Sequence, residues 1–101
     1  MERFHAATKD FDRIVRMIVE KYRPRRIVQW GSLLRPDHFD EHSDIDIATE
    51  GILDAETWFA LLGDAMELTR FPLDIVQLEK IEPEFAAQIL RKGKVVYESE
   101  G

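Results

Sequence analysis

Two aspartates separated by a single residue, Asp44 and Asp46, have the spacing in this sequence that best suits chemistry. They lie in a run that ends at Ala48 and alternates polar and apolar residues, which is typical of a half-buried strand. Side chains two residues apart on a strand leave the same face, so both carboxylates should point to one side of a sheet. Because adjacent carboxylates repel each other, the pair is costly unless a cation lies between them. Oxygen ligands of this kind suit Mg²⁺, which commonly takes one or two carboxylates together with substrate phosphates.

A second candidate feature is the pair Gly31-Ser32, which follows the apolar run from Ile27 to Trp30. This run is typical of a strand, and a Gly-Ser turn at its end lets backbone N–H groups and a hydroxyl approach an anion closely. The strand before Gly31 would therefore end in a phosphate-binding turn, called here the phosphate cradle. The next strand would begin with the two aspartates of a metal-binding site. In the simpler interpretation, Ser32 only caps the turn that follows it.

A third carboxylate, Asp74, lies in another strand-like run, Leu73 to Leu78. If the apolar neighbours of Asp74 face the helices, its side chain faces the same way as Asp44 and Asp46, provided that the two strands are adjacent. Three carboxylates can hold two divalent ions about 3.5–4 Å apart for in-line phosphoryl displacement, and the third can take the proton of an attacking hydroxyl. The alternatives are a solvated strand edge for the first two aspartates and a structural ion pair with an arginine for Asp74.

The elements that must position these side chains follow from hydrophobic periodicity and from helix end signals. Pro24 ends the first helix, Asp54 caps the second, and Pro83 and Gly93 bracket the third. The expected helices cover residues 8–23, 55–70 and 83–92, and the expected strands cover 26–30, 44–49, 73–78 and 94–97. The sequence therefore predicts a single α/β (α+β) domain over residues 1–101, with a two-layer mixed sheet of about four strands and the helices on one face.

Composition limits the classes of function. The sequence has 101 residues and no cysteine, which excludes a disulfide framework and a thiolate zinc site. It has no apolar stretch of membrane-spanning length and no signal-peptide pattern, so we expect a cytoplasmic location and no membrane partner. The net charge of −6 argues against direct nucleic-acid binding, but not against a nucleotide whose charge Mg²⁺ compensates. His38 and His42 are interpreted as exposed loop residues, because no third zinc ligand accompanies them.

The carboxylate face should continue into apolar surface. Ala48 shares a strand face with Asp46, and Val76 and Leu78 share one with Asp74. Exposed apolar patches usually mark an interface. We therefore expect a second chain, either another copy or an acceptor protein, to cover this part of the sheet.

The pattern Gly31-Ser32, Asp44-x-Asp46 and Asp74 resembles that of the minimal nucleotidyltransferases (MNT proteins), small members of the DNA polymerase β-like superfamily. Arg35 matches an arginine that commonly follows Gly-Ser in this family, and residues 89–98 (ILRKGKVVYE) are similar to the end of many MNT chains. The resemblance implies the nucleotidyltransferase fold.

At two positions the sequence departs from that pattern. Leu33 and Pro36 stand where many relatives carry a basic residue and a glycine. These departures concern the triphosphate contacts and leave the metal site unaffected.

The resemblance also implies roles for single residues. Asp44, Asp46 and Asp74 would be the catalytic residues and would bind Mg²⁺, as two ions. The nucleotide, expected to be ATP, would be held by Gly31, Ser32, Arg35 and Ser43. An acceptor hydroxyl would attack the α-phosphate and release pyrophosphate.

Many MNT proteins act as antitoxins of HEPN-domain RNase toxins, and some do so by transferring AMP to a tyrosine of the toxin. We therefore expect a HEPN-domain partner or a homo-oligomer. Two alternatives remain open. The chain could be a non-catalytic antitoxin or nucleotide-binding module that masks its partner by contact. It could also be a sensor or a small-molecule transferase, although the latter normally carries a further domain that grips its acceptor.

Overall fold

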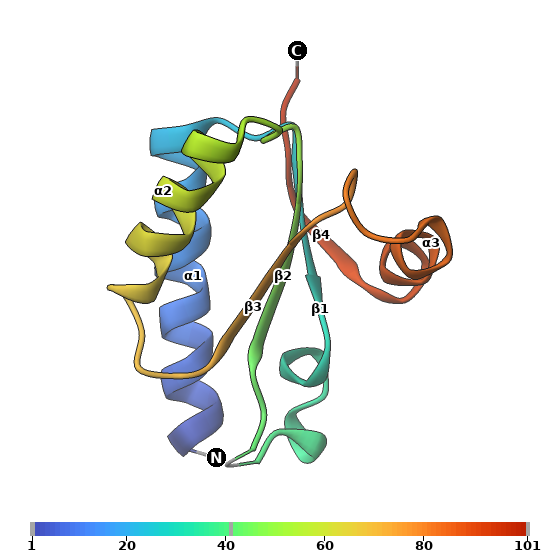
Figure 1. Ribbon diagram of the computed structural model, residues 1–101. Coiled ribbons are helices and arrows are strands. Elements are labelled where there is room, and N and C mark those ends of the chain that lie inside the picture. The colour runs from blue at the N-terminus through green and yellow to red at the C-terminus, as the bar shows by residue number, and fades with distance from the viewer. Residues whose placement is uncertain (1, 41, 101) are drawn as a thin grey trace.

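The computed structural model describes residues 2–40 and 42–100, which form three helices and a four-stranded sheet (Figure 1). The predicted order of helix, strand, strand, helix, strand, helix and strand is confirmed. The elements are α1 (Glu2–Tyr22), β1 (Arg26–Trp30), β2 (Ile45–Glu50), α2 (Ala55–Met66), β3 (Leu73–Gln77), α3 (Pro83–Lys92) and β4 (Lys94–Glu98), with two short 3₁₀ helices, η1 (Ser32–Leu34) and η2 (Pro36–His38), between β1 and β2. None of the described helices has the length and apolar character needed to cross a membrane.

The sheet has the strand order β3-β2-β1-β4 and is mixed, as predicted. β1 is antiparallel to β2 and to β4, whereas β2 and β3 are parallel. In the register, Trp30 of β1 lies opposite Asp46 of β2, and Asp46 lies opposite Asp74 of β3. Residues that lie opposite each other in neighbouring strands point to the same face. Trp30, Asp46 and Asp74 therefore form one row across the sheet.

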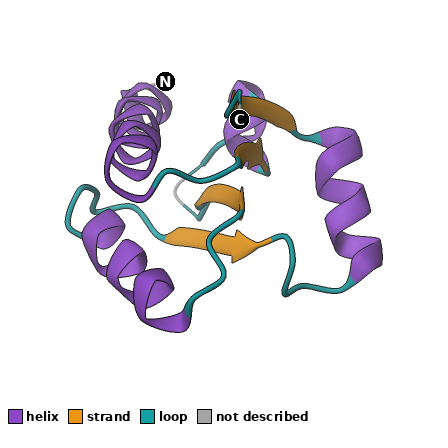
Figure 2. Cartoon of the chain, turned by 90° about the horizontal axis from the view of Figure 1, so that it is seen from above, coloured by secondary structure: helices purple, strands orange, loops and turns teal. Residues whose placement is uncertain are grey.

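One face of the sheet packs against α1 and α2, which lie together on that side (Figures 1 and 2). Ile45 and Ile47 of β2 are fully buried in this layer, while Asp46 between them points away from it. The alternation predicted from the sequence is confirmed. The core residues of this layer are Ala7, Phe11, Ile14, Ile18, Ile27, Leu33, Ile45, Ile47, Ile52, Trp58, Leu61 and Ala65.

Helix α1 begins at Glu2, earlier than the predicted start near Thr8. The Thr8 hydroxyl donates a hydrogen bond of 2.9 Å to the carbonyl oxygen of Phe4, so Thr8 lies inside the helix and does not cap it. Phe4 packs against the core and against Phe39, with ring centroids 6.0 Å apart. The first turn of the helix therefore depends on tertiary contacts that helical periodicity alone does not reveal.

Helix α3 lies on the opposite face of the sheet from α1 and α2 (Figures 1 and 2), so the expectation that the helices share one face is wrong for α3. The handedness of the connections explains this position. The connection through α2 runs from β2 outward to β3, and the connection through α3 runs back across the sheet from β3 to β4. Both connect parallel strands, and such crossovers are nearly always right-handed. Because the two run in opposite directions across the sheet, their helices must cover opposite faces.

The apolar strip beside the carboxylates is consequently covered by the chain itself. Ile89 of α3 packs against Val28, Ala48 and Leu78, and Leu78 is only 7% exposed. The expectation that a second chain covers this strip is therefore wrong. Helix α3 supplies the cover that the sequence argument attributed to another molecule.

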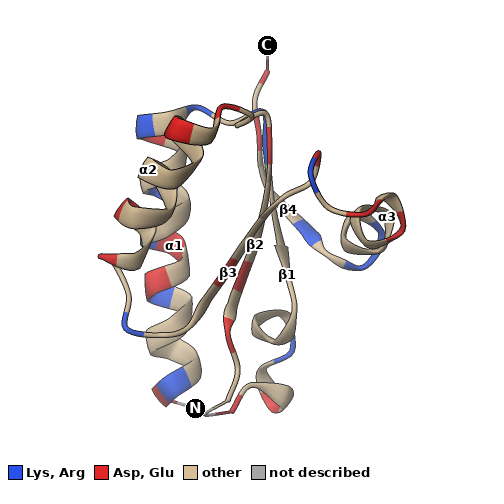
Figure 3. Cartoon of the chain, viewed as in Figure 1, with Lys and Arg blue, Asp and Glu red and all other residues tan. Residues whose placement is uncertain are grey.

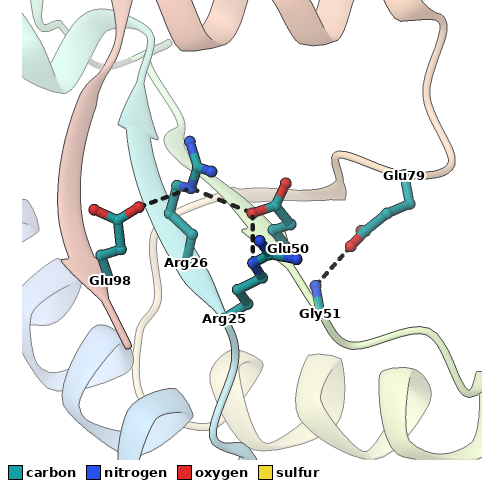
Figure 4. A network of polar contacts seen from close by, with 6 residues as sticks. All are labelled: Arg25, Arg26, Glu50, Gly51, Glu79 and Glu98. Atoms are coloured by element: carbon teal, nitrogen blue, oxygen red, sulfur yellow. Dashed lines mark hydrogen bonds and ion pairs between the residues drawn. The ribbon is translucent and has the colours of Figure 1, made fainter. Parts of the chain in front are cut away.

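A network of ion pairs ties the strands together at the end of the sheet far from Asp46 (Figure 4). The Nε of Arg26 lies 3.2 Å from Oε1 of Glu50 and 3.6 Å from Oε2 of Glu98. The backbone N–H of Gly51 donates a hydrogen bond of 2.7 Å to Oε2 of Glu79. These contacts connect β1, β2, β4 and the turn after β3, and they favour the register that aligns the carboxylates.

Candidate functional site

The three predicted carboxylates lie on the face of the sheet opposite α1 and α2. Asp46 and Asp74 are partners in the register of β2 and β3, and Asp44 immediately precedes β2. Figure 3 shows the acidic segments of β2 and β3 side by side. Asp46 is 8% exposed, Asp44 is half-buried, and Asp74 is exposed on the edge strand. The face that period-two alternation predicted is the one that these side chains occupy.

The electrostatics of this row show that its negative charge is uncompensated. Burial, followed by repulsion from Asp74 and Asp44, raises the pKa of Asp46 to about 7. Burial and repulsion from Asp44 also raise the pKa of Asp74. Within the described residues, no lysine, arginine or histidine forms an ion pair with any of the three. The alternative in which Asp74 forms a structural ion pair with an arginine is therefore wrong for the described residues.

The donor set fits a hard divalent cation that shares its coordination with a phosphate. Carboxylate oxygens are the ligands that Mg²⁺ prefers, and Mg²⁺ commonly takes only one or two of them together with water and substrate oxygens. Among the described residues, no group of three or more His, Cys, Asp or Glu side chains is spaced to hold an ion by itself. Asp44 and Asp46 could therefore hold the cation jointly with a phosphate.

Gly31 brings the turn after β1 into direct contact with Asp46. Its φ of 82° lies in the left-handed region, and a Cβ added at this position would be 1.9 Å from Oδ2 of Asp46. The turn then continues into η1, where the N–H of Arg35 donates to the carbonyl oxygen of Ser32 at 2.9 Å. Within the described part of the chain, the Ser32 hydroxyl caps no helix and forms no hydrogen bond. It is therefore available to a ligand.

A pocket of about 640 Å³ opens beside this turn, between the loop after β1 and helix α3. Its volume is in the range of pockets that bind small ligands. The predicted residues Gly31, Ser32 and Arg35 line it. An aromatic pair also lines it, with the rings of Trp30 and Phe85 packed edge to face at a centroid distance of 5.4 Å. The turn, the carboxylates and the pocket are therefore contiguous, because Gly31 contacts both of the others.

Ser43, the fourth predicted nucleotide ligand, does not line this pocket. Its hydroxyl oxygen accepts a hydrogen bond of 3.0 Å from the N–H of Asp40, and its own N–H donates to the carbonyl oxygen of Asp40 at 3.1 Å. These contacts close a turn in the loop that leads into β2. A role for Ser43 in nucleotide binding stays a prediction.

Sequence reasoning missed the contribution of α3 to the pocket. Helix α3 and the turn that follows it supply Phe85, Gln88, Ile89, Lys92, Gly93 and Lys94. Hydrophobic periodicity predicts only that this helix has a buried side, to which Phe85 and Ile89 belong. The available signal was the pair of lysines around the helix-ending glycine, which becomes informative only once the face that α3 covers is known.

Solved structures with a similar fold come from toxin–antitoxin complexes. One complex, crystallised with AMP-PNP, contains a chain that matches with a TM-score of 0.72 and 20% identity, over 89% of this chain and 74% of that one. A chain of an MntA–HepT complex matches with a TM-score of 0.67 and 19% identity, over 92% of this chain and 74% of that one. A complex of tri-AMPylated Shewanella oneidensis HEPN toxin with MNT antitoxin contains a chain that matches with a TM-score of 0.68 and 20% identity, over 93% of this chain and 74% of that one. At these identities the likeness shows a shared fold.

Comparison with curated proteins gave no match. The family model described as "Polymerase beta, Nucleotidyltransferase" matches residues 12–101, which include the Gly-Ser turn and all three aspartates. This match spans most of the sequence and agrees with the mixed sheet and with the fold of the similar structures. The chain therefore belongs to the polymerase beta nucleotidyltransferase family.

Proposed function

We propose that this chain transfers AMP from ATP to a tyrosine hydroxyl of a HEPN-type toxin and thereby acts as its antitoxin. The observation that carries the proposal is the row formed by Asp46 and Asp74, with Asp44 beside it and the Gly31 turn in contact with it. Support for the nucleotide and the partner comes from the similar structures, whose descriptions name AMP-PNP and an AMPylated HEPN toxin.

In this proposal, different residues bind the metal ions, bind the phosphates and accept the proton of the acceptor hydroxyl. Mg²⁺ ions held by the three aspartates would stabilise negative charge on the phosphates as a Lewis acid. The backbone at Gly31 and the hydroxyl of Ser32 bind phosphate oxygens, and Arg35 adds a positive charge beside them. Asp74 is exposed on the edge strand, so it can face an incoming hydroxyl and accept its proton. The hydroxyl oxygen then bonds to the α-phosphorus, the bond from that phosphorus to the bridging oxygen breaks, and pyrophosphate leaves.

Intact mass spectrometry tests this proposal directly. A HEPN-type toxin is incubated with the chain and Mg-ATP, and the mass of the toxin should increase by one or more AMP groups. Asp44→Asn should abolish the increase while the chain stays folded. The matched control is Asp12→Asn, which removes an exposed carboxylate from α1 and should leave the transfer unchanged.

The binding alternative predicts a different result. If the chain neutralises the HEPN protein without any change of mass, and Asp44→Asn neutralises it equally well, transfer is not the function. The chain would then act as a non-catalytic antitoxin that masks its partner by contact.

A further inference from the structure

Three residues with permanently positive side chains line the pocket beside Gly31. Arg35 comes from the loop after β1, and Lys92 and Lys94 come from the turn between α3 and β4. None of the described lining residues is acidic, and no described carboxylate lies within ion-pair distance of these three cations. Figure 3 shows basic segments in the loop after β1 and at the start of β4. In a chain of net charge −6, an open pocket whose described lining includes three cations and no carboxylate is a local site for anions.

Gly93 fixes the two lysines beside the end of β1. A Cβ added at Gly93 would be 2.5 Å from the carbonyl oxygen of Ile89 and 2.7 Å from that of Gln29, so the turn approaches β1 closely. Lys92 and Lys94 flank Gly93 in the sequence, and both residues line the pocket. Since β1 leads directly into Gly31-Ser32, both lysines are held next to the proposed phosphate cradle.

The course of a bound triphosphate connects the carboxylates with this pocket. If the proposed function holds, the α-phosphate lies next to Asp46, because the group that is transferred must contact both the metal ions and the acceptor hydroxyl. The remaining phosphates cannot lie along the acidic row without repulsion, whereas the Gly31 turn opens onto the basic pocket. Among the described loop residues that line the pocket, Arg35 is the one with a permanent positive charge, and Leu33 is 4% exposed and packs into the core. Any further positive side chains beside the two terminal phosphates therefore come from outside this part of the loop.

We infer that Lys92 and Lys94 bind the β- and γ-phosphates of the nucleotide, opposite Arg35. Helix α3 is then part of the nucleotide site as well as the cover of the apolar strip. This inference rests on the proposed function for the identity of the ligand. It concerns binding alone, so it can be tested without any transfer to an acceptor.

Isothermal titration calorimetry in EDTA tests the inference with inorganic tripolyphosphate and AMP as probes. The double variant Lys92→Met/Lys94→Met should weaken tripolyphosphate binding by at least about tenfold, because each lysine contributes charge-assisted hydrogen bonds. AMP lacks the two terminal phosphates, so its affinity should change by less than about threefold. Lys92→Arg/Lys94→Arg keeps both charges and should keep most of the tripolyphosphate affinity.

The matched control is Lys9→Met/Lys80→Met, which makes the same change in net charge at two exposed lysines outside the pocket. This control should bind tripolyphosphate within about twofold of the unaltered chain. The inference is overturned if the pocket variant binds as tightly as the unaltered chain, if both double variants lose affinity equally, or if the unaltered chain does not bind tripolyphosphate. If the unaltered chain still transfers AMP in the intact-mass assay, any of these results refutes only the role of the two lysines. If the transfer fails, the binding measurements still decide the role of the lysines.

Discussion

The Cα atom of Gly31 lies against the carboxylate of Asp46, so that a methyl group at residue 31 would come 1.9 Å from Oδ2 of Asp46. The turn after β1 and the central acidic side chain of β2 therefore touch with no other side chain between them. This contact also helps to keep Asp46 at 8% exposure, which in turn raises its pKa. The proposed phosphate cradle and the carboxylate row form one unit, and a change in either moves the other.

Gly31→Ala should damage both stability and transfer. The positive φ alone costs an alanine about 1–2 kcal/mol, and the new methyl group must also displace the Asp46 carboxylate. A displacement of about 1 Å at a reacting centre can lower a rate about 100-fold. Urea unfolding and the intact-mass assay measure the two effects.

Gly63 provides the control for this substitution. It lies inside α2, and a Cβ at this position would meet nothing within 4 Å. Gly63→Ala should therefore stabilise the chain by about 0.4–1 kcal/mol and leave transfer intact. Equal behaviour of the two alanine variants would show that the contact between Gly31 and Asp46 has no special role.

Asp46→Asn should change the pH dependence of stability in the metal-free chain. The pKa of Asp46 is raised from 3.8 to about 7, so between these values the folded chain retains a proton that the unfolded chain has lost. The free energy of unfolding therefore falls as the pH rises through this window. One pKa unit corresponds to about 1.4 kcal/mol, so the total effect across this window is on the order of 4 kcal/mol.

Urea unfolding in EDTA at about pH 5 and pH 8 measures this slope. Asparagine does not titrate, so Asp46→Asn should flatten the slope and make the chain more stable than the unaltered protein at the higher pH, although it abolishes transfer. Asp12→Asn on the exposed side of α1 should keep the original slope. If Asp46→Asn left the slope unchanged, the burial and repulsion of Asp46 would not govern it.

Ile89→Ala should loosen α3 from the sheet. Ile89 is 3% exposed and packs on Val28, Ala48 and Leu78, and the loss of such a side chain typically costs about 2–5 kcal/mol. Because α3 carries one wall of the pocket, tripolyphosphate binding should weaken as well. The neighbouring Leu90 is 40% exposed, and Leu90→Ala should change stability by about 0.5 kcal/mol or less.

Hydrogen exchange and urea unfolding distinguish the two α3 variants. In Ile89→Ala, the amides of α3 should exchange faster through local opening. The amides of α1 should exchange faster only to the extent that the free energy of global unfolding falls. Unchanged exchange in α3 would mean that contacts other than those of Ile89, such as the packing of Phe85 on Trp30, hold this helix on the sheet.

The sequence alone identified the acidic residues and the face that they occupy. Asp44 and Asp46 alternate with Ile45 and Ile47, and this alternation requires only that one side of the strand be buried, which is a local property of the chain. Helix end signals are equally local, and Asp54 caps α2 by accepting a hydrogen bond of 2.9 Å from the N–H of Thr57. The types and order of the elements were predictable for the same reason.

Only the tertiary structure decided which of these residues meet. Nothing within β2 or β3 dictates that Asp46 lies opposite Asp74, because register depends on pairing between segments far apart in the chain. The contact between Gly31 and Asp46 likewise joins two strands. The position of α3 follows from the order of strands in the sheet, and periodicity within a helix shows that it has a buried face but not which surface that face covers. For this reason the sequence identified the carboxylates, whereas the fold decided that Lys92 and Lys94 line the pocket beside the Gly31 turn.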